Sequence, residues 1–303
     1  MKTTVPSHLY LPSVILKEKE YHYHFLKKTL TQEKTLSFDF TFIHNGKTND
    51  DSKQTVVKIN RSNLLINKEK PDETLIGELL SHSSQALFPL RVSVNSYGFP
   101  KKLCNHAEIL ERWKSFIPRL EDYYDVGKAT DLLNRVSKIY KNPGYLFDSL
   151  KNDLFFSVFF LPVYGDYGLS RISVIDDFEF TFTPGQKEKY SLELEILNEY
   201  TENGKIKILV HGTSHSTKDN TVSGYFLLNK DRSIHKIEIV FYFSAYNEEI
   251  KIHVFETKET AEVKTGINVV FDEQEERKKL SESKRFFLEE IKNSDLIKHN
   301  IKR

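Results

Sequence analysis

This 303-residue sequence contains little cysteine and little glycine, and neither positive nor negative charge is in large excess. Cys104 is the only cysteine, which excludes an internal disulfide and an all-cysteine zinc site. The 44 basic and 43 acidic residues nearly cancel, and no basic stripe stands out. Nucleic-acid-binding proteins usually show such an excess, so we expect no nucleic-acid partner.

Long hydrophobic runs are also missing. A membrane-spanning helix needs ~18 apolar residues in a row, and the longest run, "LFFSVFFLPVY", has about half that length. The apolar stretch near the N-terminus is short, interrupted at Pro12 and followed at once by charged residues, unlike a signal peptide. We therefore expect no membrane span and a cytoplasmic location.

Motifs for the common cofactors are absent too. The chain has only 12 glycines and contains neither a G-x-G-x-x-G nor a Walker pattern. A G-x-S-x-G nucleophile elbow is missing. The acidic pairs at 50–51 and 176–177 do not have the spacing of an EF-hand loop. No cofactor is predicted.

Aromatic residues, by contrast, are plentiful, with 22 phenylalanines and 15 tyrosines. In "TLSFDFTFIH" (35–44) apolar residues alternate with polar ones, which predicts a strand with one buried face. The polar stretch after it predicts a turn, with Asn45-Gly46 as the expected bend. The same alternation returns after residue 170 in several short segments joined by polar turns, which is typical of an antiparallel meander.

The middle third predicts helices. Asn105 and Glu108 have the spacing of a capping box at a helix start. The stretch 145–160 predicts one helix whose second half is apolar on every side, so it should be central in the fold. We therefore predict an α+β fold: a large antiparallel sheet built from the N- and C-terminal thirds, covered on one face by three to four helices.

We expect residues 1–271 to form a single domain, with an alternative boundary near 168. Residues 272–303 predict a charged C-terminal helix. A thin apolar seam runs along this helix, and its members are the candidates for binding a protein partner: Leu280, Phe287 and Ile291.

Two histidine pairs have the spacing of metal ligands. His211 and His215 in "VHGTSHSTKD" are four residues apart, but we expect a strand that ends at His211 and Gly212 and continues as a polar loop. Along a strand they would be ~13 Å apart, too far to share a metal. His22 and His24 share one face of a predicted strand and are close enough to chelate. No third ligand is indicated near His211 and His215, and we expect His22 and His24 on an edge or solvent-facing side of a strand whose aromatic residues lie inside, so no metal site is predicted.

The candidate for catalysis is Cys104. It precedes a predicted helix start, where the helix dipole lowers the pKa of a thiol, and His106 is a nearby base. His106 would sit on the first turn and point away from Cys104, however, and lone cysteines are mostly small buried residues.

These observations leave three classes of function. The absence of a catalytic signature and the charged terminal helix favour a non-enzymatic interaction protein: an adaptor, chaperone or structural subunit of a cytoplasmic assembly. The alternative is a carrier or sensor that holds a small hydrophobic ligand between sheet and helices. The third class is an enzyme with scattered catalytic residues, such as a Cys104 thiol.

Overall fold

The computed structural model describes residues 4–11, 18–47, 55–71, 75–123, 127–183 and 186–257. All of them belong to one compact unit, Met1–Glu259. The predicted C-terminal helix at 272–303 lies outside the described residues, and so do Leu280, Phe287 and Ile291.

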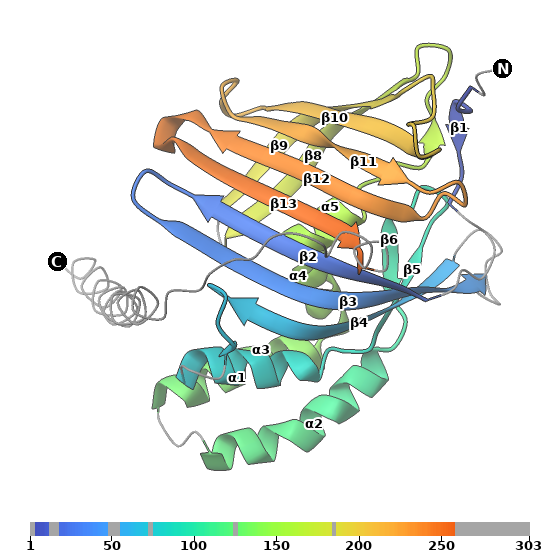
Figure 1. Ribbon diagram of the computed structural model, residues 1–303. Coiled ribbons are helices and arrows are strands. Elements are labelled where there is room, and N and C mark those ends of the chain that lie inside the picture. The colour runs from blue at the N-terminus through green and yellow to red at the C-terminus, as the bar shows by residue number, and fades with distance from the viewer. Residues whose placement is uncertain are drawn as a thin grey trace, which may run out of the picture. The chain divides into compact units, whose positions relative to one another are not determined.

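In the described part, eleven strands form one antiparallel sheet in the order β6-β5-β4-β3-β2-β13-β12-β11-β10-β9-β8 (Figure 1). The N-terminal strands are β2 (Lys19–Lys28), β3 (Glu33–Lys47), β4 (Thr55–Ile66), β5 (Leu90–Val94) and β6 (Pro100–Leu103). The C-terminal strands are β8 (Ile172–Thr183), β9 (Gln186–Ile196), β10 (Ile206–Ser214), β11 (Thr221–Leu228), β12 (Ile234–Phe243) and β13 (Glu248–Glu256). The short β1 (His8–Leu9) and β7 (Gly165–Asp166) pair with each other.

The pairing of β13 with β2 joins the two ends of the meander. These strands run antiparallel from Glu249 opposite Lys28 to Glu256 opposite Tyr21. The N- and C-terminal thirds thus contribute neighbouring strands of one sheet, which confirms the predicted α+β fold with a large antiparallel meander.

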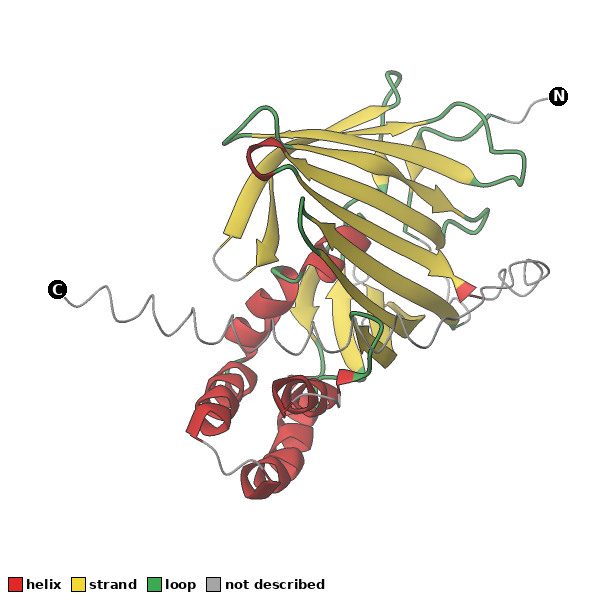
Figure 2. Cartoon of the chain, turned by 60° about the vertical axis from the view of Figure 1, so that its left-hand side comes forward, coloured by secondary structure: helices red, strands yellow, loops and turns green. Residues whose placement is uncertain are grey.

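One face of the sheet is apolar, and the sheet curls around it (Figure 2). Three strands separate β8 from β12 in the sheet. Nevertheless, the ring of Phe180 on β8 lies 4.9 Å from that of Phe241 on β12, and Phe182 lies 4.8 Å from Phe243. The C-terminal half of the sheet therefore fills its own concave side with side chains.

Gly224 is needed where β11 passes close to β12. A Cβ atom at this position would lie only 2.0 Å from the carbonyl oxygen of Glu238. A glycine inside a strand commonly marks such a close approach of two backbones.

Within the described ranges, five α-helices lie between β4 and β7: α1 (Leu75–Gln85), α2 (His106–Tyr123), α3 (Gly127–Lys141), α4 (Pro143–Lys151) and α5 (Leu154–Phe159). Helices α1, α2 and α3 pack on one another, and in the view of Figure 1 they lie below β4, while α5 lies behind the strands. None of the helices in the described ranges has the length and apolar character that a membrane span requires.

The predicted helix at 145–160 is in fact two helices, which is why five are found instead of three to four. The chain leaves α4 at Asn152, and the side chain of Asp153 then caps α5. In an uninterrupted helix, each backbone N–H donates to the carbonyl four residues earlier. Here the Phe156 N–H donates to the Asp153 side chain, so Asp153 marks the start of a new helix. The predicted central position of the apolar half is confirmed, because all of α5 is buried.

Three local predictions were wrong. The Asn105 side chain does not cap α2: it accepts a hydrogen bond from the Arg91 N–H and donates one to the Pro89 carbonyl, tying β5 to the helix start. Asn45-Gly46 is not a turn, since β3 continues through it to Lys47. Strand β10 does not end at His211 but runs on to Ser214. In β10, the pairing of Gly212 and Thr213 with β11 prevailed over the local turn preference. In β3, the register with β4 shifts between His44 and Lys47, so Asn45-Gly46 forms an irregularity within the strand.

Candidate functional site

Helix α5 lies against the concave face of the sheet, and each of its six residues is buried. The carboxylate of Asp153 accepts a hydrogen bond from the Phe156 N–H at 3.1 Å, and burial raises the pKa of Asp153. The Ser157 hydroxyl donates to the Lys151 carbonyl at 2.9 Å. A helix this short gains little stability from its own hydrogen bonds, so its packing against the sheet must hold it.

That packing is aromatic. The ring of Phe155 lies 5.1 Å from Tyr23, 5.2 Å from Phe38 and 5.0 Å from Phe40, edge to face in each case. Phe159, one turn later, continues the contact with Phe40 at 5.2 Å. Ring quadrupoles favour the edge-to-face arrangement. The β2–β3 part of the concave face is thus covered by the aromatic side chains of α5, which also contacts β8. The rings of β8 and β12 meet one another on the other part of this face.

A cavity lies at the C-terminal end of α5, between this segment and the sheet. Its volume is about 30 Å³, room for one or two water molecules. It is lined by Leu11, Lys19, Tyr21, Phe42, His44, Val57, Val94, Gly98, Phe159, Phe160, Leu161, Tyr164, Ser233 and Ile234. A larger ligand fits only if side chains such as Phe159 and Phe160 move aside.

His44 is the most unusual residue of this cavity. Its side chain is only 4% exposed, and its Nδ1 atom has no hydrogen-bond partner. The ring stands edge-on to Phe42, with 5.0 Å between centroids. Burial lowers the pKa of His44 to about 4, against a smaller opposing effect of Asp231. The imidazole is therefore neutral at pH 7.

The other polar groups of the cavity are bonded within the protein. The Tyr21 hydroxyl donates to the Ile234 carbonyl at 2.7 Å, and the Tyr164 hydroxyl donates to the Arg232 carbonyl at 2.9 Å. Burial raises the pKa of both phenols, which keeps them protonated.

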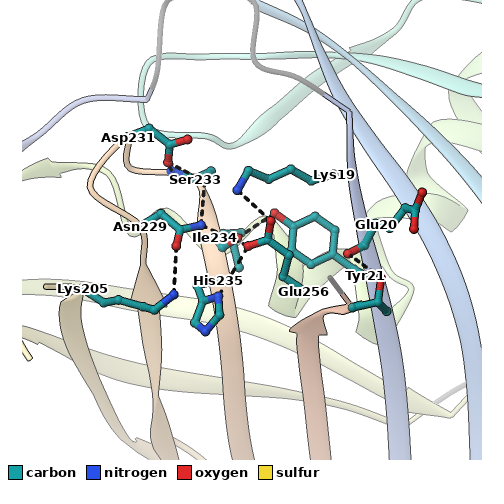
Figure 3. A network of polar contacts seen from close by, with 11 residues as sticks. Lys19, Glu20, Tyr21, Lys205, Asn229, Asp231, Ser233, Ile234, His235 and Glu256 are labelled. Carbon is teal, nitrogen blue, oxygen red and sulfur yellow. Dashed lines mark hydrogen bonds and ion pairs between the residues drawn. The ribbon is translucent and has the colours of Figure 1, made fainter. Parts of the chain in front are cut away.

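A polar network borders the cavity where β2, β12 and β13 meet (Figure 3). Glu256 is at its centre and accepts hydrogen bonds from Lys19 at 2.9 Å and from Asn229 at 3.2 Å, with His235 Nδ1 at 3.4 Å. Burial acts to raise the pKa of Glu256, but these bonds hold it below its usual value. Glu256 and Lys19 thus form a partly buried ion pair.

Asp231 is the second carboxylate of this network. It accepts hydrogen bonds from the hydroxyl of Ser233 at 2.5 Å and from its backbone N–H at 2.9 Å. Burial acts to raise the pKa of Asp231, but these hydrogen bonds and the charge of Lys19 keep it below its usual value. Both carboxylates of the network are therefore ionised at pH 7.

A second, larger hollow of about 530 Å³ lies along α3. Its lining is polar throughout: Asp131, Asn134, Arg135, Ser137, Lys138 and Lys141. An apolar ligand would leave these groups without hydrogen bonds, so the cavity beside α5 is the better candidate for such a ligand.

Cys104 and His106, the predicted thiol and base, bind different neighbours. Cys104 is exposed, and its Sγ lies 3.7 Å from the Lys102 carbonyl. His106 is the first residue of α2, and its Nε2 lies 2.8 Å from the Tyr140 carbonyl.

The structure does not bring either histidine pair together with a third ligand. His211 lies on the exposed face of β10, while His215 lies beyond its end with Nδ1 3.4 Å from Asp177. His22 Nδ1 lies 2.7 Å from Asp39 on β3, and the His24 ring lies 6.3 Å from that of His253 on β13. Among the described residues, no group of three or more histidine, cysteine, aspartate or glutamate side chains is placed to hold a metal ion.

His44, Lys19 and Glu256 are not among the residues predicted from the sequence. The sequence pattern could have pointed to His44, because it follows Phe38, Phe40 and Phe42 at the same two-residue spacing and therefore lies on the same apolar face of β3. No signal connects Lys19 with Glu256, because these residues are 237 positions apart and meet only through the pairing of β2 with β13.

No protein-family model matches the chain, and no curated protein matches it. Among solved structures, a structure described as "Lipid-protein interactions in lipovitellin" is similar at a TM-score of 0.37 and 10% sequence identity. The match covers 79% of this chain and 25% of that chain, so this chain spans about a quarter of the lipovitellin structure. A DUF1329 family protein from Desulfovibrio piger is similar at a TM-score of 0.21 and 8% identity, covering 83% of this chain and 88% of the other.

Proposed function

We propose that this chain binds a hydrophobic ligand between the concave face of the sheet and α5, and serves as a carrier or sensor of that ligand. The main support for this proposal is the cavity at the end of α5, which is lined mostly by apolar residues of the sheet and of the α5 segment. Ligand sites are typically concave and apolar with a few placed polar groups, as here. Among the described residues, nothing supports the adaptor function that we expected from the sequence.

The ligand has to displace aromatic side chains, because the cavity alone is too small. Burying one methylene group contributes ~0.8 kcal/mol, so a chain of about ten methylenes contributes roughly 8 kcal/mol. Exposing one buried phenylalanine costs about 1.5–3 kcal/mol. Displacement of Phe159 and Phe160 therefore leaves a favourable balance of about 2–5 kcal/mol, and we expect an affinity near the millimolar range.

Phe160→Ala tests this proposal. Phe160 lines the cavity and is 6% exposed, so its truncation enlarges the cavity without touching the polar network. We expect about tenfold tighter binding of N-phenyl-1-naphthylamine, a neutral probe that fluoresces in apolar surroundings, because the probe no longer displaces this ring.

Phe226→Ala is the matched control. Phe226 is fully buried on β11 and does not line the cavity, so its truncation destabilises the fold without enlarging the site. We expect its probe affinity to equal that of the unaltered chain. If the unaltered chain does not bind the probe, or if both variants bind it equally, the proposal is wrong.

A further inference from the structure

The unpartnered Nδ1 atom of His44 is the starting point. A buried polar atom without a hydrogen bond costs about 1–3 kcal/mol, and native structures seldom keep one unless water or a ligand completes it. His44 lines the cavity beside α5. Its Nδ1 atom is buried while the cavity is closed, so a ligand reaches it when Phe159 and Phe160 move aside, as the proposed function already requires.

The charges around the cavity decide which head group fits. Lys19 also lines the cavity, but its ammonium is bound to Glu256. The negative charge of Asp231, in the turn between β11 and β12, acts to raise the pKa of His44. The Lys205 ammonium donates a hydrogen bond to Asn229 at 3.2 Å. The charges of Lys19 and Lys205 are thus matched by those of Glu256 and Asp231.

An ionised head group would therefore find no unpaired opposite charge. Burying a charge without a partner costs several kcal/mol, whereas a neutral polar group needs only a hydrogen bond.

A hydroxyl group satisfies His44 in either tautomer. A neutral imidazole carries a proton on one nitrogen and accepts at the other, and a hydroxyl group both donates and accepts. It can donate to a bare Nδ1 or accept from a protonated one. An ionised carboxylate only accepts, and an ammonium only donates.

We infer that the ligand is a neutral, hydroxyl-bearing amphiphile, such as a long-chain alcohol, with its hydroxyl on His44 Nδ1 and its chain along Phe159 and Phe160. This inference rests on the proposed function. It adds the polarity and orientation of the ligand, which a hydrophobic site alone does not specify.

The experiment compares three ligands of equal chain length as competitors of N-phenyl-1-naphthylamine at pH 8. These are 1-decanol, decanoate and decylammonium. In the unaltered chain we expect 1-decanol to compete about tenfold better than either ion. In His44→Phe the preference should disappear while the probe still binds, because phenylalanine preserves the ring against Phe42 but cannot form the hydrogen bond.

His215→Phe is the control, since His215 lies at the exposed end of β10 and does not line the cavity. It should keep the preference for decanol.

Two outcomes separate this inference from the proposed function. If the probe binds but decanoate or decylammonium competes as well as decanol, the inference is overturned and the hydrophobic site remains. If the probe does not bind to the unaltered chain, both are overturned. If His44→Phe does not fold, the comparison of ligands in the unaltered chain still overturns the inference when either ion competes as well as decanol.

Discussion

The imidazole of His44 places a buried polar atom without a hydrogen-bond partner on the largely apolar concave face of the sheet. His44 occupies a position that alternation assigns to the core, directly after three phenylalanines of the same row. An aliphatic residue there would avoid the cost of an unpartnered nitrogen. Because His44 lines the cavity, a bound molecule that displaces the neighbouring rings comes within reach of the imidazole.

The burial of His44 makes stability depend on pH. Its pKa is about 4 in the folded chain and about 6.5 when unfolded, so the unfolded state binds the proton first as pH falls. The full contribution of the neutral ring is present above pH 6.5 and is lost as pH falls toward 4. The shift corresponds to roughly 3 kcal/mol.

We therefore expect urea unfolding at pH 7.5 and pH 4.5 to show a larger loss of stability for the unaltered chain than for His44→Phe. The difference should be roughly 2–3 kcal/mol. Other titrating groups act equally in both proteins, so they cancel in the comparison. Equal losses in the two proteins would show that His44 is accessible to protons in the folded state.

At the scale of elements, α5 is held by the sheet rather than by its own sequence. It has only six residues, and its neighbours in the chain are the Asp153 cap and the turn before Pro162. An isolated helix of that length is unstable in water. Its position therefore depends on the aromatic side chains of β2 and β3, the contacts that a ligand would replace.

Phe155→Ala should show how much α5 depends on those contacts. Phe155 packs against Tyr23, Phe38 and Phe40, and truncation of a buried phenylalanine typically costs 3–5 kcal/mol. We expect a loss of about that size in the free energy of unfolding measured with urea. Tyr145→Ala on α4, which is exposed, should change it by less than about 0.5 kcal/mol. Similar small losses in both variants would mean that α5 contributes little to stability.

The whole sheet explains why the candidate site is where it is. The β8–β12 half curls until its own phenylalanines meet, and α5 contacts it at β8. The β2–β3 part depends on α5 for cover. A ligand can compete with a short helix more easily than with strands bound to neighbours on both sides, because fewer backbone hydrogen bonds break.

Deletion of the predicted C-terminal helix, residues 272–303, tests whether it belongs to the core or binds a partner. We expect deletion of residues 272–303 to leave the melting temperature unchanged, because the described core lies within 4–257. If Leu280, Phe287 and Ile291 bind a partner, the deletion weakens association, which light scattering would show as a lower mass. A collapse of thermal stability with no change in mass would instead assign the helix to the core.

The alternation of apolar and polar residues in the sequence alone determined the strands, their buried faces and the antiparallel meander. That pattern is local, since each strand depends on residues within a few positions of one another. It also predicted that the apolar stretch ending in "LFFSVFF" would be central.

Only the tertiary structure decided that β13 pairs with β2, that β8 meets β12, and that His44 adjoins a cavity bordered by Lys19 and Glu256. Lys19 and Glu256 are far apart in the sequence and contribute no local pattern. Their juxtaposition follows from strand order and sheet curvature, which depend on packing over the whole chain.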